Sequence, residues 1–119
     1  VGTLVVGNVM ESLREGEIKS TKIQIKSIGK ILLDYKRKCR MYPTTDQGLE
    51  ALVDAPTTAP ECKNYPKSGF ITGGSVPQDA WGFDFDYQSD GRTYTITSYG
   101  ADGMEGGEEE YADISSNDL

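Results

Sequence analysis

The stretch ESLREGEIKSTKIQIKSIGKILLDYKRK, residues 11–38, decides the fold of this 119-residue chain. Apolar side chains recur along it at steps of three to seven residues and lysines occupy the other face, a pattern typical of an amphipathic α-helix. The apolar stripe consists of Met10, Leu13, Ile18, Ile25, Ile28, Leu32 and Tyr35. The basic face carries Lys19, Lys22, Lys26 and Lys30. The sequence therefore predicts one long helix with an apolar side and a basic side.

This helix is predicted to be too long for its own domain. No proline interrupts residues 1–42, and the apolar run VGTLVVGNVM (1–10) continues into the helical pattern. A helix of more than about 35 residues is about 55 Å long at ~1.5 Å per residue, and a small domain cannot cover it. Ten residues do not span a bilayer, which takes about 20, so this run is either the end of a longer membrane helix or a plain buried start. We expect the N-terminal half of the helix to pack against lipid or against other chains.

After the helix the pattern changes. Pro43 ends the helical stretch, and TTDQGLEALVDAP (44–56) predicts a short second helix, capped by Thr44 or Thr45. Its inward-facing side chains are Leu49, Leu52 and Val53. Residues 55–69 contain three prolines and are predicted to be a loop.

The last third of the chain predicts β-structure. FDFDY (83–87) and RTYTITSY (92–99) alternate apolar and polar residues on either side of the turn signal SDG (89–91), which is typical of a hairpin. Phe70 and Ile71 are predicted to add a short strand.

Charge is distributed unevenly along the chain. Residues 1–40 carry nine Lys or Arg and four acids, a net charge of +5, whereas residues 41–119 carry three bases and fifteen acids, a net charge of −12. A basic end and an acidic end favour head-to-tail association of copies. A solvated helix face beside an acidic domain is the simpler alternative. Nucleic acid is not expected as a partner, because the basic residues lie on one helix without stacking aromatic residues.

The residue inventory argues against catalysis. No histidine is present, which removes the commonest general base and the commonest transition-metal ligand. Nucleophilic catalysis would then need a lysine or tyrosine base, and no spacing in the sequence indicates one. Cys39 and Cys62 are too few for a zinc site. They form either one disulfide across residues 41–61, if the protein is exported, or two free thiols.

The segment SYGADGMEGGEEEYADISS (98–116) combines acids with glycines. Calcium takes six to eight oxygen ligands from carboxylates, hydroxyls and carbonyls. The side chains of Asp102, Asp113 and Ser115 could supply such oxygens, and the glycines would let the carbonyls of Tyr99 and Met104 turn inward. On composition alone, a disordered acidic tail is equally compatible with this segment.

The whole chain resembles the major pseudopilins of type II secretion systems, relatives of the type IV pilins. The resemblance rests on an ordered series of motifs that covers most of the chain. These motifs are NVM (8–10), KSTKIQIKSIGKILLDYK (19–36), MYPTTDQGLEALV (41–53), DAWGFDFDY (79–87) and YTITSYGADGMEGGEEEYADISS (94–116). Ala80 stands where the family's D-P-W-G turn has a proline, and neither cysteine is typical of the family.

The resemblance implies an α+β fold in which a long N-terminal helix packs on a small antiparallel β-sheet, with a short second helix and a calcium-binding C-terminal loop. Residues 1–38 would be the C-terminal part of a longer, partly membrane-embedded helix, and residues 39–119 the globular domain. The implied calcium ligands are the side chains of Asp102, Asp113 and Ser115 and the carbonyls of Tyr99 and Met104.

The implied function is structural, not enzymatic. Such subunits start in the inner membrane of a Gram-negative bacterium and polymerise into a periplasmic pseudopilus that drives exoprotein export. The implied partners are other copies of the chain, minor pseudopilins and an inner-membrane assembly platform, with the secretin and the exported cargo as further candidates. The basic helix face and the acidic domain would set the subunit register, so we expect reversal of Lys22 and Lys26 to glutamate to weaken assembly without unfolding the domain.

Two other functions are compatible with the sequence. The chain could be a type IV pilin, although those usually close their C-terminal region with a disulfide, and the last cysteine here is Cys62. It could instead be a secreted calcium-dependent binding or adhesion module. Such a module would stay monomeric, whereas a pseudopilin assembles.

Overall fold

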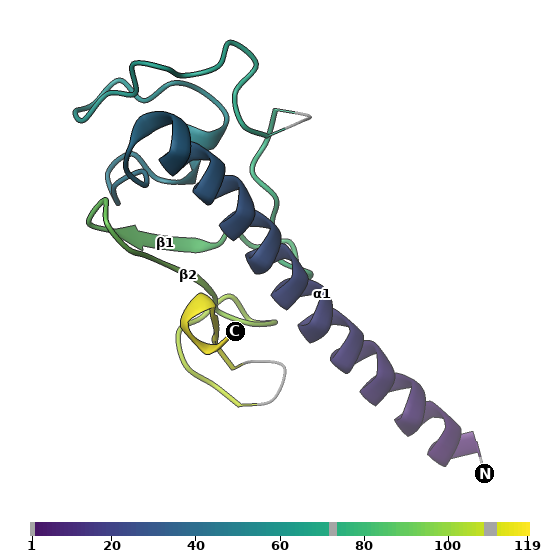
Figure 1. Ribbon diagram of the computed structural model, residues 1–119. Helices are drawn as coiled ribbons and strands as arrows, with labels where there is room; N and C mark the ends of the chain where they lie inside the picture. Colours follow the sequence, from purple (N-terminus) through teal and green to yellow (C-terminus); the bar gives the residue numbers. More distant parts are fainter. Residues whose placement is uncertain (1, 72–73, 109–111) are drawn as a thin grey trace.

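The computed structural model describes residues 2–71, 74–108 and 112–119, with side chains described from residue 13 onward. A long helix, α1 (Gly2–Cys39), leads into a small domain. The domain contains the short 3-10 helices η1 (Leu49–Leu52) and η3 (Ser116–Asp118) and the strands β1 (Asp86–Ser89), β2 (Tyr94–Ser98) and β3 (Ile114–Ser115). The molecule measures 62 × 27 × 20 Å, and α1 defines its long axis (Figure 1). The predicted long helix and small antiparallel sheet are confirmed.

Helix α1 runs for 38 residues, as the uninterrupted pattern predicted. The N–H of Arg40 still donates to the Lys36 carbonyl at 2.7 Å, but Arg40 has a φ of 71°, so the backbone reverses there. The helix therefore ends before Pro43 is reached. Within the described ranges, no helix is both long enough and apolar enough to cross a membrane.

The core forms where the apolar stripe of α1 meets the sheet. Ile25, Ile28, Leu32 and Tyr35 are each at most 2% exposed. Their partners in the core are Leu49, Leu52, Ile71, Phe85, Tyr87, Ile96 and Ile114. Leu13, nearer the N-terminus, is 57% exposed, because this part of α1 projects beyond the domain (Figure 1). From Leu13 onward, the stripe is thus buried only over its C-terminal part.

The second helix is shorter and tighter than predicted. Gly48 has a φ of 64° and interrupts the segment, so that only the 3-10 helix η1 forms after it. Neither predicted threonine caps η1. The Thr44 hydroxyl accepts from the Gln47 N–H at 3.4 Å within a preceding turn, and the Thr45 hydroxyl is bonded to Ser89. Leu49 and Leu52 are buried, as expected, and Val53 is half-buried.

The hairpin is confirmed, but both strands are shorter than predicted and the first is shifted from residues 83–87 to Asp86–Ser89. Strand β1 pairs antiparallel with β2, with Tyr87 opposite Ile96. It begins at Asp86 because residues 79–83 are held in a turn, where the Asp79 carboxylate accepts from the N–H groups of Trp81 and Phe83. The predicted strand at Phe70 and Ile71 was wrong. Phe70 donates one backbone hydrogen bond to the Leu52 carbonyl at 2.8 Å and otherwise lies in a bend.

A disulfide joins Cys39 to Cys62, with the two Cα atoms 4.7 Å apart. Of the two alternatives that the sequence left open, the disulfide is therefore the one present. It fixes the last residue of α1 to the proline-containing loop. Next to it, the ring of Phe70 packs at 5.2 Å from Tyr35 and 5.3 Å from Tyr65, measured between centroids.

Candidate functional site

The short strand β3 brings the two ends of the acidic segment together. It pairs antiparallel with β2, with Thr97 opposite Ser115 and Ser98 opposite Ile114. Tyr99 directly follows β2 and Asp113 directly precedes β3. Because these two strands pair antiparallel, both residues lie at the same end of the strand pair. The sequence did not predict this strand, because two residues carry no detectable alternation.

Both candidate carboxylates accept a backbone hydrogen bond from the segment itself. Oδ1 of Asp102 accepts from the Met104 N–H at 3.0 Å, and Oδ1 of Asp113 accepts from the Gly106 N–H at 3.0 Å. The second contact ties the residues after β2 to those before β3. Both side chains are exposed. The described segment is therefore an ordered loop rather than the free tail that its composition allowed.

Three carboxylates, those of Asp86, Glu105 and Asp113, act on the phenol of Tyr99. Burial raises the pKa of its phenol above the usual value, and the negative charges of Asp86, Glu105 and Asp113 raise it further. An acidic group whose pKa is raised by carboxylates lies in a region of negative potential. A cation bound at this end of the strand pair would offset that potential.

Of the other predicted ligands, Ser115 is the last residue of β3 and Met104 lies in the loop. Ser115 is half-buried, and its hydroxyl accepts from the Asn117 N–H at 3.1 Å. The Met104 side chain is 67% exposed, so only its backbone is available to the loop interior. Gly103 has a φ of 66°, and a Cβ there would lie 2.9 Å from the Phe83 ring. Glycine at 103 is therefore required by both conformation and space.

The oxygen donors of this loop fit calcium better than a transition metal. The candidate set has two carboxylates, a hydroxyl and two carbonyls, which are hard ligands. In the ranges that the structure describes, no three acidic, histidine or cysteine side chains are grouped closely enough to hold a metal by themselves. A site here would therefore depend on backbone carbonyls and on Ser115. Figure 1 shows the described residues that follow β2 as a loop that extends beyond the end of the sheet.

Asp79 positions this loop, and sequence reasoning missed it. The side chain is only 6% exposed. Its Oδ2 accepts from the Ser98 hydroxyl at 2.7 Å, and the Ser98 Oγ in turn accepts from the Gly100 N–H at 3.3 Å. The carboxylate that holds the turn at 79–83 thus also fixes the first residues of the candidate loop. The D-x-W-G motif was a signal for a turn, but its link to Ser98 exists only in three dimensions.

The same turn is bonded to the long helix. The N–H of Ala80 donates to the hydroxyl of Thr21 at 3.2 Å, and Thr21 is fully buried on α1. A proline at position 80 has no N–H and could not make this bond. The alanine that departs from the family motif therefore gives this chain an additional hydrogen bond between helix and turn.

Taken together, a long helix that projects from a small antiparallel domain, with a glycine-rich acidic loop at the sheet edge, defines the class of pilin-like proteins. The family described as type II secretion system (T2SS), protein G matches residues 8–117. The chain belongs to this family.

Known relatives agree with this assignment. The type II secretion system core protein G of Vibrio cholerae is 41% identical over 116 residues, which cover 96% of this chain and 77% of the relative. That of Pseudomonas aeruginosa is 39% identical over 120 residues, covering 99% and 83%. The crystal structure of the major pseudopilin from the type 2 secretion system of enterohaemorrhagic Escherichia coli superposes with a TM-score of 0.79 at 32% identity, covering 94% of this chain and 96% of that one.

Proposed function

We propose that this protein is a structural subunit of the type II secretion pseudopilus, which polymerises into a periplasmic filament that drives the export of folded proteins. The observation that carries the proposal is the projecting half of α1 on a fold that superposes with a major pseudopilin. Leu13 and Ile23 are 57% and 56% exposed on a helix that contributes Ile25, Ile28, Leu32 and Tyr35 to the core. Such exposed apolar residues favour contacts with other copies.

The proposal extends to location and partners. We infer that the subunit is held in the inner membrane before assembly and lies in the periplasm once it is part of the filament. Minor pseudopilins, the inner-membrane platform, the secretin and the cargo would be its further partners. These inferences rest on membership of the family. The role is one of assembly, and the proposal assigns no catalytic step to the chain.

Complementation tests the proposed function. The full-length protein would be expressed in a Gram-negative host whose own gene for the major pseudopilin is deleted. We expect filaments on the sheared cell surface and recovery of protein export. Replacement Leu13→Glu should leave the domain folded, because this side chain is outside the core, yet reduce assembly strongly. A folded wild-type protein at normal abundance that gives neither filaments nor export would contradict the proposal.

We also propose that one structural calcium ion is held by the side chains of Asp102, Asp113 and Ser115 and the carbonyls of Tyr99 and Met104. The ion would supply positive charge between the residues that follow β2 and those that precede β3. Three observations support this proposal: the oxygen donors, the negative potential around Tyr99, and the tie between Gly106 and Asp113. The loop buries little apolar surface, so a cation is its best source of further stability.

Thermal unfolding with calcium, with magnesium and with a chelator tests this proposal. At about 100 times the Kd, one calcium should stabilise the folded state by roughly 2.7 kcal/mol. Asp113→Asn should remove most of this gain, whereas the matched change Asp54→Asn, in an exposed loop outside the site, should leave it intact. Equal stabilisation by magnesium, or none by calcium, would defeat the assignment.

A further inference from the structure

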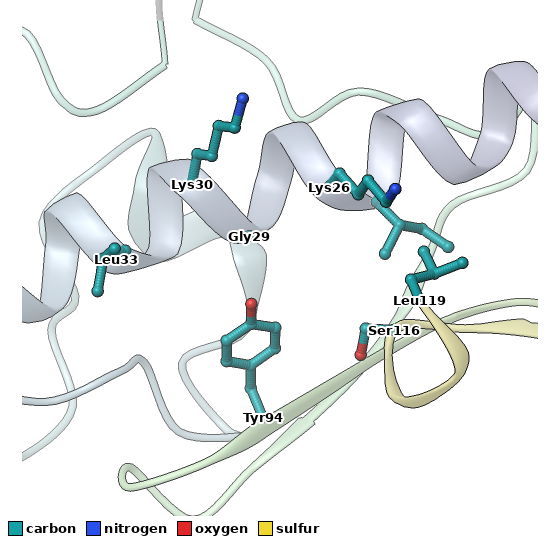
Figure 2. A pocket seen from close by; sticks show the side chains of 8 residues that line it. Lys26, Gly29, Lys30, Leu33, Tyr94, Ser116 and Leu119 are labelled. Carbon is teal, nitrogen blue, oxygen red and sulfur yellow. The ribbon is translucent and has the colours of Figure 1, made fainter.

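A hollow lies between α1 and the sheet, on the side of the helix that carries its lysines. Its volume is about 350 Å³. Ile25, Leu33, Tyr94 and Leu119 give it an apolar lining, and Lys26 and Lys30 add positive charge. In Figure 2 the two lysines leave α1 on either side of Gly29, and the hydroxyl of Tyr94 points toward that glycine.

Glycine at position 29 keeps the hollow in this shape. A Cβ at residue 29 would lie 2.8 Å from the Tyr94 hydroxyl oxygen, so a larger residue would displace the ring that forms the wall of the hollow. The Tyr94 ring also packs against two other aromatic rings, with its centroid 4.8 Å from that of Tyr42 and 6.3 Å from that of Tyr87. The wall that Tyr94 forms is therefore fixed by its aromatic neighbours.

The two lysines are available to a partner. Both are exposed, and within the described part of the chain neither has an ion pair with a carboxylate. They are four residues apart and so lie one turn apart on the same face of α1. A ligand for this surface would combine an apolar group with two or more negative charges.

One segment of the chain itself has this chemistry. Met104 is 67% exposed, the largest exposed fraction among the large apolar side chains in the described residues. Glu105 and Glu108 follow it and are also exposed. The segment 104–108 therefore presents an apolar side chain beside two carboxylates, and none of its residues lines the hollow.

We propose that the hollow of one copy binds residues 104–108 of a second copy, with Met104 on the apolar lining and Glu105 and Glu108 near Lys26 and Lys30. This proposal rests on the proposed function, because it names the contact between subunits. The contact is heterologous unless the same two copies exchange it reciprocally. Repeated heterologous contacts give an open filament unless the rotation closes into a ring. The calcium proposed above would order the segment that docks.

A charge exchange in the full-length protein tests the contact. Lys26→Glu with Lys30→Glu should reduce filament yield about ten-fold, because attraction across the contact becomes repulsion. Adding Glu105→Lys and Glu108→Lys to the same chain should restore most of the yield. The control pair Lys63→Glu and Lys67→Glu makes the same charge change at exposed positions outside the hollow. An unchanged yield in the first variant, or no recovery in the exchanged one, would overturn the proposal, provided that thermal unfolding shows each variant folded.

Carbodiimide cross-linking gives a test that does not require filaments. The 119-residue chain would be mixed in ¹⁴N and ¹⁵N forms at high concentration and cross-linked, and the linked peptides identified by mass spectrometry. We expect mixed-isotope links from Lys26 or Lys30 to Glu105 or Glu108. Links within one chain only, or links between chains that avoid these residues, would overturn the contact.

The two tests separate this proposal from the proposed function. Mixed-isotope links in a protein that forms no filaments would support the contact and count against the pseudopilus. Filaments without such links, and with unchanged yield after reversal of the lysines, would support the pseudopilus and overturn the contact.

Discussion

Residues 54–71 and residues 99–108 are both long connections without a helix or strand, and different interactions hold them. In the first connection, Cys62 is joined by the disulfide to Cys39, the last residue of α1. This connection is also attached at Tyr65, whose hydroxyl donates to the Ala51 carbonyl at 2.9 Å. Gln47 adds two bonds, because its Nε2 donates to the carbonyls of Thr58 and Pro60. Covalent, aromatic and amide contacts therefore hold a segment whose two acids and two bases give no net charge.

The second connection depends on carboxylates. Asp102 holds it from within, Asp113 holds it from the residue before β3, and Asp79 holds it through Ser98. Apart from the contact of Gly103 with the Phe83 ring, the described part of this loop buries little. The comparison teaches that a disulfide and hydrogen bonds to neutral groups hold the first connection, whereas hydrogen bonds to carboxylates hold the second. The stability of the second connection should therefore depend more on bound cations.

The largest effect is expected at the aromatic cluster beside the first connection. Tyr35 is 1% exposed and packs on Tyr65 and Phe70. Tyr35→Ala should lower the free energy of unfolding by about 4 kcal/mol, because it removes a large buried ring and leaves a cavity. Ile23→Ala, at a 56% exposed position on the same helix, is the control and should cost much less. Urea denaturation measures both. Equal costs would contradict the placement of the core.

Removal of the disulfide should have the next largest effect. The bond joins residues 23 apart, and the double change Cys39→Ser with Cys62→Ser should cost about 3 kcal/mol through the entropy of the unfolded chain. The comparison adds a sharper expectation, namely that the stabilisation by calcium should be the same in this variant as in the wild type. A calcium effect that disappears with the disulfide would show that the two connections are not independent.

An intermediate effect is expected at Asp79, which belongs to the second connection. Asp79→Asn weakens the acceptor for two N–H groups and a hydroxyl, so we expect a loss of about 2 kcal/mol. Hydrogen exchange should speed up at the amides of Phe83 and Gly100, and should remain unchanged at the amide of Phe70 in the first connection. The control is Asp84→Asn, at an exposed carboxylate, which should change stability by less than about 0.5 kcal/mol. Faster exchange throughout the domain would mean that the loop is not held separately.

The smallest effect is expected at Tyr87. Its hydroxyl donates to the Pro43 carbonyl at 2.7 Å, so Tyr87→Phe should cost about 1 kcal/mol at neutral pH. Burial raises the pKa of Tyr87 from 10.0 to about 12. The folded pKa is above the unfolded one, so the contribution is fully present below pH 10 and is lost as the pH rises toward 12. Denaturation at several alkaline pH values should therefore give a shallower loss for Tyr87→Phe than for the wild type. An identical loss would assign the alkaline transition to other tyrosines.

Local patterns predicted the parts of the fold that repeat along the chain. The spacing of Ile25, Ile28 and Leu32 was sufficient to predict α1, because apolar residues repeat in the sequence with the period of a helix. The alternation in residues 92–99 was sufficient for β2. The predicted turn at residues 89–91 is displaced to residues 90–93, because Ser89 pairs with Tyr94 and Asp90 accepts from the N–H groups of Arg92 and Thr93.

Other features depended on contacts between distant residues. Gly48 shortened the second helix, although a single glycine does not by itself end a helical pattern. The pairing of β3 with β2 and the link from Asp79 to Ser98 join segments that the sequence treats separately. For the calcium site the sequence supplied candidate residues on one loop, and the coordination of an ion by Asp102, Asp113, Ser115, Tyr99 and Met104 stays a prediction.

The disulfide has a further consequence for a chain that is cut. Cys39 and Cys62 close a covalent ring that contains the exposed residues 57–61. A protease that cleaves one bond in this exposed stretch opens the ring but does not divide the molecule, since both pieces stay joined through the sulfurs. The nicked protein would run as one band on a denaturing gel and as two after reduction. The loop therefore tolerates a break that elsewhere in the domain would release a fragment.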